Sequence, residues 1–449
     1  MVVVYAVVAL LVVCVLVAAH WYLWRRLVRD VAARGTRYRR VGTVLIVVLP
    51  LTTVASQVVH RAGLPFALER VLAWPGYLWL ALLLYLLLAL LVGEAVRPLL
   101  RRFLERRDAA DAPGASRETP GETATAAPAE PAPAEPSGDG RAATARPAPT
   151  AVAVRDGDRD GSGPGSGDAP PPAAGPSRRL FVARTVAAAA GVAAAGTVGY
   201  GTYGVLRGPR IKRVTVPLAK LPRAAHGYRI AVVSDIHLGP ILGRSHTRRI
   251  VDAINRTDAD LVAIVGDLVD GSVADLGPAA EPLSELRSRD GSYFVTGNHE
   301  YFGDAGEWVD HVRELGVEPL ENARRELRHF DLAGVNDLAG EEEGQGPDFQ
   351  RALGDRDTSR AVVLLAHQPV QIHEAVDHGV DLQLSGHTHG GQMWPATYLA
   401  QAANPTLAGL ERYGDTQLYV TRGAGAWGPP VRVGAESDIT VVELASRQA

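Results

Sequence analysis

The sequence predicts an α/β layered fold for the C-terminal half of the chain, preceded by transmembrane helices in the N-terminal half. The strands are indicated by short apolar runs, several rich in Val and Ile, that alternate with longer segments. The transmembrane helices are indicated by long uncharged runs within the first 107 residues. We expect strands at residues 230–234, 261–265, 293–296, 362–365, 382–385, 418–421 and 439–444.

Residues 1–107 form a predicted membrane domain with three transmembrane helices. Residues 2–24, 41–59 and 71–92 contain no Lys, Arg, Asp or Glu, and each run is long enough to cross a hydrocarbon core of about 30 Å. Three such runs leave no polar face for water, which argues against buried helices of a soluble core. A secretory signal peptide would explain only the first run.

The arginine residues orient these helices. Seven arginines lie between the first and second runs and five follow the third, whereas the loop between the second and third runs has only Arg61 and Arg70. The positive-inside rule therefore places the first loop and the segment after the third run in the cytoplasm. We expect the N-terminus to lie outside.

Residues 108–177 form a predicted disordered linker. The segment has no aromatic residue, no Leu, Ile or Met, and 13 of the chain's 30 prolines. Such a segment cannot bury enough apolar surface to offset the entropy lost on ordering.

Residues 178–206 are expected to form a fourth transmembrane segment. Arg178 and Arg179 precede a weakly apolar, Ala- and Gly-rich run, which looks like a twin-arginine export signal placed inside the chain. An ordinary span with basic residues on its cytoplasmic side is the alternative. Both interpretations carry the rest of the chain outside. One observation opposes this orientation, namely the basic residues just beyond the segment: Arg207, Arg210, Lys212 and Arg213.

Charge and cysteine content exclude several classes of function. Divided after residue 206, the chain has a net charge of +7 in its N-terminal part and −10 in its C-terminal part. The acidic C-terminal part argues against a nucleic-acid groove there. Cys14 is the only cysteine and lies in an apolar run, which excludes an internal disulfide framework and a Cys-rich zinc site. Any metal must be held by His, Asp, Glu or Asn.

A polar cluster follows each of five predicted strands. Each cluster alone is compatible with ordinary turn chemistry. Ligand sites in α/β sheets gather at the carboxyl ends of strands, so the five clusters can converge on one point. Together they offer enough nitrogen and oxygen ligands for two adjacent divalent ions, with groups left for catalysis. The clusters are Asp235-Ile236-His237, Gly266-Asp267-Leu268-Val269-Asp270, Gly297-Asn298-His299-Glu300, Ala366-His367-Gln368-Pro369 and Gly386-His387-Thr388-His389-Gly390-Gly391-Gln392.

The five motifs, in this order, resemble those of the calcineurin-like metallophosphoesterase superfamily. The resemblance covers residues 212–444, and the fifth motif looks like that of the membrane-associated or exported bacterial branch. The resemblance implies that residues 207–449 form a layered sandwich of mixed β-sheets flanked by helices.

The resemblance also implies the metal ligands. Asp235, His237 and His389 would hold one divalent ion, and Asn298, His367 and His387 would hold the other, with Asp267 bridging them. A carboxylate can share its two oxygens between ions about 3.5–4 Å apart, whereas a neutral imidazole binds only one. The two ions, expected to be Mn, Fe or Zn, would activate a water for attack on phosphorus.

His299 and Asp270 are the expected catalytic residues. His299 follows a metal ligand and is placed to stabilise the phosphoryl oxygens or to protonate the leaving oxygen. Asp270 matches the family carboxylate that orients this histidine. A cap for the following helix is the alternative role for Asp270.

One departure from the protein phosphatases of the superfamily concerns the substrate. Those enzymes continue the second motif with Arg-Gly, where this chain has Gly271-Ser272, which disfavours a phosphoprotein substrate. Arg422 and Arg244 are the candidates to replace the missing phosphate-binding arginine. The alternative for each is a solvated surface charge. We interpret the histidines outside the motifs as surface or capping residues: His226, His246, His311, His329, His373 and His378.

The sequence thus predicts a membrane-anchored, metal-dependent phosphohydrolase with an extracytoplasmic catalytic domain. It would cleave phosphoester or pyrophosphate bonds, with a lipid-linked or envelope molecule as one substrate class and a soluble phosphoester or nucleotide as another. The non-enzymatic alternative is a membrane sensor or scaffold that has kept the domain without catalysis. No nucleic-acid partner is expected.

Overall fold

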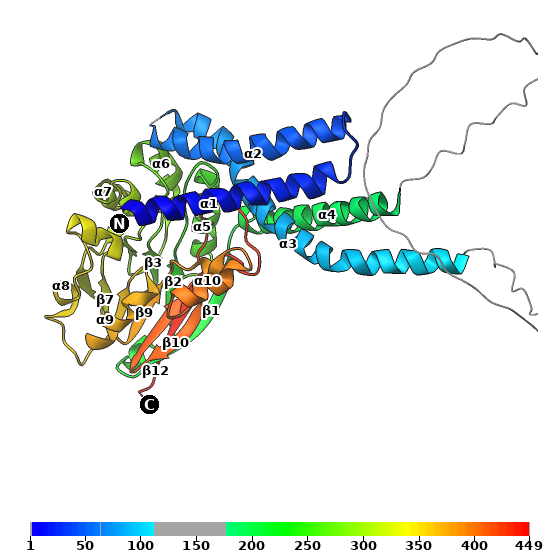
Figure 1. The fold of residues 1–449 in the computed structure, drawn as a ribbon. Helices are drawn as coiled ribbons and strands as arrows, with labels where there is room; N and C mark the ends of the chain where they lie inside the picture. The colour runs from blue at the N-terminus through cyan, green and yellow to red at the C-terminus, as the bar shows by residue number, and fades with distance from the viewer. Residues whose placement is uncertain (1, 63, 112–176, 449) are drawn as a thin grey trace, which may run out of the picture.

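A computed structural model describes residues 2–62, 64–111 and 177–448 of the chain. Four long helices come first along the chain, and two β-sheets with flanking helices follow (Figure 1). Residues 112–176, which make up most of the predicted linker, lie outside the described residues.

The four long helices are α1 (Val2–Leu23), α2 (Arg37–Arg61), α3 (Phe66–Asp111) and α4 (Arg178–Leu206), with the π-helical segment η1 (Trp24–Arg29) after α1. Each of the four is long and apolar enough to cross a membrane. The predicted apolar helices are therefore confirmed. Helix α3 continues well beyond residue 92, because the Leu, Arg and Glu residues that follow are strong helix formers.

Helices α3 and α4 pack closely against each other. A Cβ atom at Gly93 would lie 2.5 Å from Cγ1 of Val186, so a larger residue there would require the Val186 side chain or the helices to shift. Leu90 of α3 and Ala194 of α4 are buried in one apolar cluster, which also includes Val431 from the C-terminal part. The helices and the C-terminal part thus share an apolar interface.

Two mixed sheets of six strands each make up the C-terminal part. The first has the order β1-β12-β2-β3-β4-β5 and the second β10-β11-β9-β8-β7-β6. The pairs β12–β2, β10–β11 and β6–β7 are antiparallel. The strands are β1 (Arg210–Leu218), β2 (Tyr228–Val233), β3 (Leu261–Val265), β4 (Ser292–Val295), β5 (Glu318–Pro319), β6 (Ala323–Glu326), β7 (Asp331–Gly334), β8 (Val362–Leu365), β9 (Leu382–Ser385), β10 (Gly409–Tyr413), β11 (Thr416–Val420) and β12 (Asp438–Ser446).

Helices cover both outer faces of this sandwich. Side chains such as Val265, Leu365 and Leu384 fill the space between the sheets. Helices α5 (Arg244–Asn255), α6 (Val273–Ala280) and α7 (Ala305–Glu314) cover the first sheet, and α8 (Phe349–Leu353) and α9 (Ile372–Asp377) the second. Helix α10 (Ala396–Ala403) has no buried residue. The short helical turns are η2 (Arg223–Ala225), η3 (Glu281–Glu285), η4 (Glu300–Phe302), η5 (Leu338–Glu343), η6 (Pro369–Gln371) and η7 (His389–Gly391). The predicted α/β layered class is confirmed.

All seven predicted strands are present, as β2, β3, β4, β8, β9, β11 and β12. The apolar pattern does not indicate β1, β5, β6, β7 or β10. Strands β1, β5, β6 and β10 lie at or next to the sheet edges and keep charged or polar side chains toward solvent. Strand β7 is buried, but it is only four residues long and contains Asp and Gly.

Three of the four basic residues that follow α4, namely Arg210, Lys212 and Arg213, belong to strand β1 of the first sheet. Arg210 forms an ion pair with Glu436 at 2.7 Å, and Lys212 forms one with Asp438 at 2.5 Å. These ion pairs tie Arg210 and Lys212 to the segment before and at the start of β12. The positive-inside rule counts Lys and Arg alone, so the basic residues still oppose an external catalytic domain.

Candidate active site

Five loops meet at the carboxyl ends of β2, β3 and β4 in the first sheet and of β8 and β9 in the second. These loops carry the nine residues predicted for the site, all of them buried or half-buried. The structure brings all nine together in one connected set of side-chain contacts.

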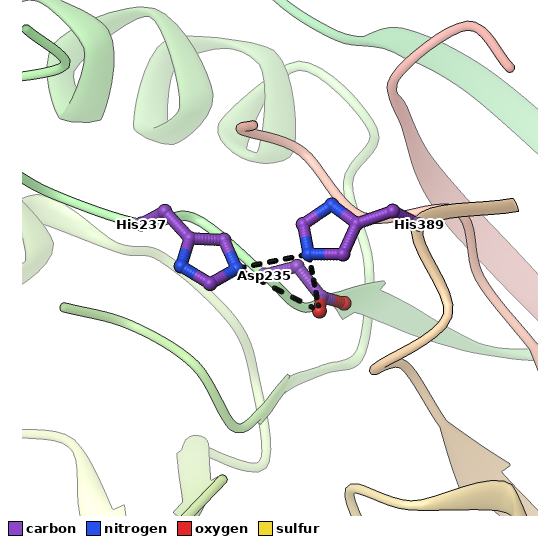
Figure 2. Close-up of side chains that lie close together, drawn as sticks. All are labelled: Asp235, His237 and His389. Atoms are coloured by element: carbon purple, nitrogen blue, oxygen red, sulfur yellow. Dashed lines mark hydrogen bonds and ion pairs between the residues drawn. The ribbon is translucent and has the colours of Figure 1, made fainter. Parts of the chain in front are cut away.

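Asp235, His237 and His389 form the first group (Figure 2). Nε2 of His237 lies 3.0 Å from Nε2 of His389. Oδ1 of Asp235 lies 3.3 Å from Nε2 of His389 and 3.9 Å from Nε2 of His237. One nitrogen from each imidazole and one carboxylate oxygen therefore face a common point.

Asp267, His367 and His387 form the second group. Oδ2 of Asp267 lies 3.2 Å from Nε2 of His367, and the Asn298 amide oxygen lies 2.9 Å from Nδ1 of His387. Asp267 also lies beside the first group, because its Oδ2 is 3.7 Å from Nε2 of His237. This carboxylate thus stands between the two groups.

The donor atoms of the second group suit a divalent cation. His367 places Nδ1 2.8 Å from the carbonyl oxygen of Val265, so Nδ1 carries the hydrogen and Nε2 presents a lone pair. Within the described chain, Nε2 of His367 makes no hydrogen bond of good geometry, although the Asp267 carboxylate is close. A buried lone pair that faces a carboxylate oxygen needs a cation or a proton between them.

The first group is arranged similarly, with one difference at His389. Nδ1 of His237 lies 2.8 Å from Asp270, which leaves its Nε2 free to bind an ion. Arg432 donates from Nη2 to Nδ1 of His389 at 3.0 Å, so the neutral His389 ring carries its hydrogen on Nε2. Binding an ion at this Nε2 is therefore coupled to loss of that hydrogen and of the Arg432 bond.

Electrostatics divide the site into charged and neutral histidines. Burial, the largest single influence, would lower the pKa of His237, but the carboxylates of Asp270, Asp267 and Asp235 together outweigh burial and raise it to about 9. The pKa of His367 is raised well above its usual value, because Asp267, Asp235 and Asp337 together outweigh burial. Burial and the charge of His367 lower the pKa of His387 to about 4. In the second group, the His387 imidazole is thus neutral. The His367 imidazole instead favours a positive charge between its Nε2 and the carboxylates, either a proton or a metal ion.

Asp270 contacts two histidines, where the sequence predicts contact with one. Its Oδ1 lies 2.8 Å from Nδ1 of His237 and 2.7 Å from Nδ1 of His299. Burial alone would raise the pKa of Asp270, but His237 and His299 outweigh it and lower the pKa to about 2. The cap of α6 is Ser272, whose hydroxyl accepts from the amide of Asp275, so the helix-cap alternative for Asp270 is wrong.

The loops hold several of these residues in left-handed backbone conformations. Five of the eight described non-glycine residues with positive φ are predicted ligands: Asp235, His237, Asp267, His387 and His389. This region is unfavourable for residues with a Cβ, at roughly 1–3 kcal/mol each. Backbone strain of this kind clusters at functional sites, where the surrounding structure imposes it.

Sequence reasoning missed Glu300, which holds two of the loops together. Its buried carboxylate accepts hydrogen bonds from the amides of Asp267 (3.1 Å), Leu268 (2.8 Å), Val269 (3.4 Å) and Gly297 (2.6 Å). Burial, reinforced by the negative charge of Asp267, raises its pKa to about 7. The available signal was an acidic residue directly after a candidate catalytic histidine, in one of the five motif clusters.

The change Glu300→Gln is expected to destabilise the domain by about 1–3 kcal/mol for each amide left without an acceptor. Glutamine replaces one acceptor oxygen by an NH₂ group, which cannot accept from a backbone N–H. The measurement is the urea midpoint of unfolding with a chelator present, and the matched control is Glu342→Gln on the exposed turn η5. Equal midpoints for the two variants would contradict this role.

Sequence reasoning also missed Arg432, which lies behind His389. Besides its bond to the ring, it donates to the carbonyl oxygens of His389 (3.1 Å) and Gly425 (2.7 Å). Burial lowers its pKa to about 10. A single arginine in a Pro- and Gly-rich loop gives no signal in the sequence.

The two arginines proposed as phosphate-binding residues lie in different places. Arg244 is half-exposed, pairs with Glu281 and donates to the carbonyl oxygen of Pro278 at 2.7 Å. The aliphatic part of Arg422 passes beside Gly390 in the fifth motif loop. Arg422 is therefore the better placed of the two.

One prediction for the remaining histidines is wrong. His246, expected at the surface or in a cap, is 1% exposed on α5, and neither ring nitrogen has a partner among the described residues. It lies on the apolar face of α5 that packs on the first sheet, so burial lowers its pKa to about 3. The other five are exposed or half-buried.

The glutamine that ends the fifth motif holds another loop at the site. Nε2 of Gln392 donates to the carbonyl oxygens of Trp427 (2.9 Å) and Pro429 (3.1 Å), and its Oε1 accepts from the amide of Trp427 (2.9 Å). The Trp427 ring then lies 5.7 Å from the ring of His299, between centroids. Gln392 thus positions an aromatic side chain at the mouth of the site.

Comparison with known proteins agrees with this geometry. The model of the family described as calcineurin-like phosphoesterase matches residues 228–391. An uncharacterized metallophosphoesterase of Aquifex aeolicus is 32% identical over 240 residues, which cover 52% of this chain and 91% of that protein. The chain belongs to the calcineurin-like metallophosphoesterase family.

Other relatives named as metallophosphoesterases match a little more than half of the chain. The Danio rerio protein named transmembrane protein with metallophosphoesterase domain is 41% identical over 55% of this chain and 59% of its own length. An uncharacterized metallophosphoesterase of Helicobacter pylori strain J99 is 38% identical over 54% of this chain and 66% of its own length. The matches to these two relatives span less than two thirds of their length.

Proposed function

We propose that this metallophosphoesterase is a hydrolase that cleaves phosphoester or pyrophosphate bonds with two divalent metal ions. The observation that carries the proposal is the pair of adjacent ligand groups with Asp267 between them. One ion would be held by Asp235, His237 and His389. The other would be held by Asn298, His367 and His387, and Asp267 would contact both ions. Bound there, Mn, Fe or Zn would lower the pKa of a water and polarise the phosphoryl oxygens.

His299 would supply the proton for the leaving group. Its Nδ1 lies 2.7 Å from Asp270, so Nδ1 donates to that carboxylate and Nε2 is the atom that faces Asp267, 3.9 Å away. Asp270 fixes the orientation of the ring and stabilises its protonated form. Because Asp270 also holds His237, it couples the proton donor to the first ligand group.

An exposed apolar collar at the mouth of the site supports a substrate held in a lipid layer. The collar comprises Phe302 (72% exposed), Trp394 (46%), Tyr398 (65%), Leu399 (76%) and Trp427 (59%). The rings of Phe302 and Trp427 lie against His299, with centroids 4.7 and 5.7 Å away. Trp394, Tyr398 and Leu399 are exposed on the segment that follows the fifth motif. A large exposed apolar patch marks an interaction surface, and we propose that these five residues form one.

The collar is continuous with the apolar helices. The Tyr85 hydroxyl in α3 donates to the carbonyl oxygen of Trp394 at 3.0 Å. Met393, the preceding residue, packs in the apolar cluster of α3 and α4. A bilayer that surrounds these helices would thus reach the collar, so we propose that an amphiphilic, lipid-linked phosphoester enters from the bilayer.

The experiment compares two substrates with the full chain in vesicles. Leu399→Ser is expected to lower hydrolysis of lipid phosphoesters in the vesicle, phosphatidic acid or a polyprenyl diphosphate, by about tenfold or more, because it removes a leucine from the lipid layer. It is expected to leave hydrolysis of soluble bis(4-nitrophenyl) phosphate unchanged. Because α10 has no buried residue, this variant is expected to fold normally.

The matched control is Leu410→Ser on the edge strand β10, which is expected to change neither rate. Hydrolysis of the soluble ester without any lipid phosphoester would favour a soluble phosphoester or nucleotide as substrate. Hydrolysis of neither would favour the non-catalytic sensor. Equal losses on both substrates in Leu399→Ser would contradict the collar's role.

We further propose that four helices span the membrane and that the catalytic domain is extracytoplasmic. Phe66 at the start of α3 and Leu206 at the end of α4 both pack on apolar clusters of the catalytic domain. Arginine counting places these two helix ends on the same, outer side. The name of the Danio rerio relative supports membrane anchoring. Arg178 and Arg179 support a twin-arginine signal in α4, and the fifth motif supports the exported bacterial branch.

A protease added to intact cells is expected to cleave the catalytic domain and to leave residues 108–177 intact. The reason is that the positive-inside rule places this segment in the cytoplasm. Immunoblots with tags in the two regions measure the result, and permeabilised cells provide the control in which both are cleaved. Cleavage of residues 108–177 in intact cells, with the domain protected, would reverse the topology.

A further inference from the structure

A cavity of about 340 Å³ lies at the end of the helix bundle away from the catalytic domain. One water needs only about 10–15 Å³ of such space, so the cavity can hold a much larger group. Its walls come from η1, α3 and the first turns of α4. The lining residues are Arg26, Asp30, Arg97, Arg101, Ser177, Arg179, Leu180, Val182 and Ala183.

The lining carries an excess of positive charge that the nearby carboxylates do not neutralise. Asp30 is shared by the guanidinium groups of Arg25, Arg26 and Arg29. Glu94 accepts from Tyr22 (3.0 Å), Arg26 (2.9 Å) and Arg97 (3.4 Å). Among the described residues, neither Arg101 nor Arg179 has a carboxylate within ion-pair distance. Both carboxylates are thus fully engaged, while four arginines face the cavity.

Arg97 provides the second observation that points to a ligand. The residue is 8% exposed, and only its Nη1 reaches Glu94. Its Nε and Nη2 are buried and have no hydrogen-bond partner among the described residues. Unsatisfied buried donors on a charged group are costly. Because Arg97 also lines the cavity, an anion bound there would offset part of this cost.

The start of α4 adds further donors to the same cavity. This helix has 29 residues and begins beside the cavity, with Ser177 as its cap. Its first turn contains no acidic residue and carries Arg179, although the amino end of a helix already has positive partial charge. An anion in the cavity would neutralise the charge of Arg179 and the positive end of the helix, because free amides and guanidinium groups would face it.

We propose that this cavity binds the phosphate group of an anionic phospholipid. A planar guanidinium such as that of Arg97 binds two phosphate oxygens at once, and Arg101 and Arg179 supply further charge. The cavity lies at the end of four apolar helices, where lipid headgroups are expected. Leu180, Val182 and Ala183 add apolar side chains to the lining, which suits the apolar part of a lipid.

This site is separate from the candidate active site. Helix α4 has 29 residues and is therefore about 44 Å long, and the two sites lie at its opposite ends. The proposal does not depend on hydrolysis, so a failed activity assay leaves it intact. Hydrolysis of a soluble phosphodiester serves only as evidence that each variant is folded.

The test measures the melting temperature of the full chain in neutral detergent, with added lipid and at constant ionic strength. Dihexanoyl phosphatidylglycerol is expected to raise the melting temperature of the wild type, whereas dihexanoyl phosphatidylcholine and inorganic phosphate are not. Arg97→Gln is expected to weaken the apparent lipid affinity about tenfold or more. Arg179→Gln, a change at an exposed residue, provides the same test if Arg97→Gln does not fold.

The matched control is Arg102→Gln, which removes the same charge from an exposed position of α3 outside the cavity lining. It is expected to keep wild-type affinity for phosphatidylglycerol. Equal weakening by Arg102→Gln and Arg179→Gln would show only general charge attraction and would overturn the proposal. Equal stabilisation by phosphatidylcholine, or by inorganic phosphate, would also overturn the assignment to an anionic lipid.

Discussion

Asp267→Asn is expected to remove both metal ions and to lower hydrolysis by about 10³-fold or more. Oδ2 of Asp267 faces His367 at 3.2 Å and His237 at 3.7 Å, so one charge serves both ligand groups. The amide keeps the shape of the side chain but lacks that charge, so the ions are no longer held. Without the ions, the site loses several kcal/mol of transition-state stabilisation. The measurements are metal content by elemental analysis and the hydrolysis rate of bis(4-nitrophenyl) phosphate.

The matched comparison is His237→Ala, which removes a ligand from the first group alone. It is expected to deplete mainly one ion, because Asn298, His367 and His387 remain in place for the other. Two full metal equivalents in Asp267→Asn would refute the bridging assignment. Loss of both ions in His237→Ala would refute the division into two groups.

His299→Ala is expected to lower hydrolysis of alkyl phosphoesters by about 10²- to 10⁴-fold while leaving the metal content unchanged. The variant removes the Nε2 that we assign as proton donor, and it leaves all seven proposed ligands in place. An alkoxide is a poor leaving group and needs this proton. Nitrophenolate needs little protonation, so the loss is expected to be much smaller for nitrophenyl esters.

Two outcomes would change the role of His299. If both substrate classes lost activity equally with metal still bound, His299 would stabilise the phosphoryl oxygens and would not donate a proton. If metal were lost, the division between ligands and catalyst would be incorrect. Asp270→Asn provides a further comparison, because this carboxylate holds both His237 and His299.

The strands that position the site could be predicted from the sequence, whereas much of the sheet periphery could not. Strands β3, β8 and β9 are fully buried runs of four or five residues, and their bounds match the predicted ones. Strand β1 has the sequence RIKRVTVPL, and its basic residues interrupt the apolar pattern that would indicate a strand. Their partners Glu436 and Asp438 are more than 200 positions away in the sequence. Pairing between distant segments leaves no local pattern.

The candidate site shows the same division. Nine polar residues follow predicted strands, so their convergence could be expected from the sequence alone. Three other features depend on loop conformation. They are the second contact of Asp270, the hydrogen bonds that Glu300 accepts from four amides, and the bond from Arg432 to His389. Loop conformation here includes left-handed residues such as Asp235 and His387. Asp and His are enriched in this backbone region, but the enrichment does not indicate which loop residues adopt it.

The contacts between helices and catalytic domain could not be predicted at all. The bond from Tyr85 to the carbonyl oxygen of Trp394 joins residues 309 positions apart. Hydropathy identifies a span but carries no information on which face meets which partner. The apolar collar was equally hard to predict, because its members come from two loops, the helical turn η4 and the short helix α10.

The most direct test of the central claim is a metal titration of the purified full chain after removal of metal by a chelator. The hydrolysis rate of bis(4-nitrophenyl) phosphate is measured together with bound Mn²⁺ as the ion is added back. We expect no hydrolysis by the metal-free chain and full activity only when two equivalents are bound. Full activity without metal, or two bound equivalents without hydrolysis of any phosphomonoester or phosphodiester, would contradict a two-metal phosphohydrolase.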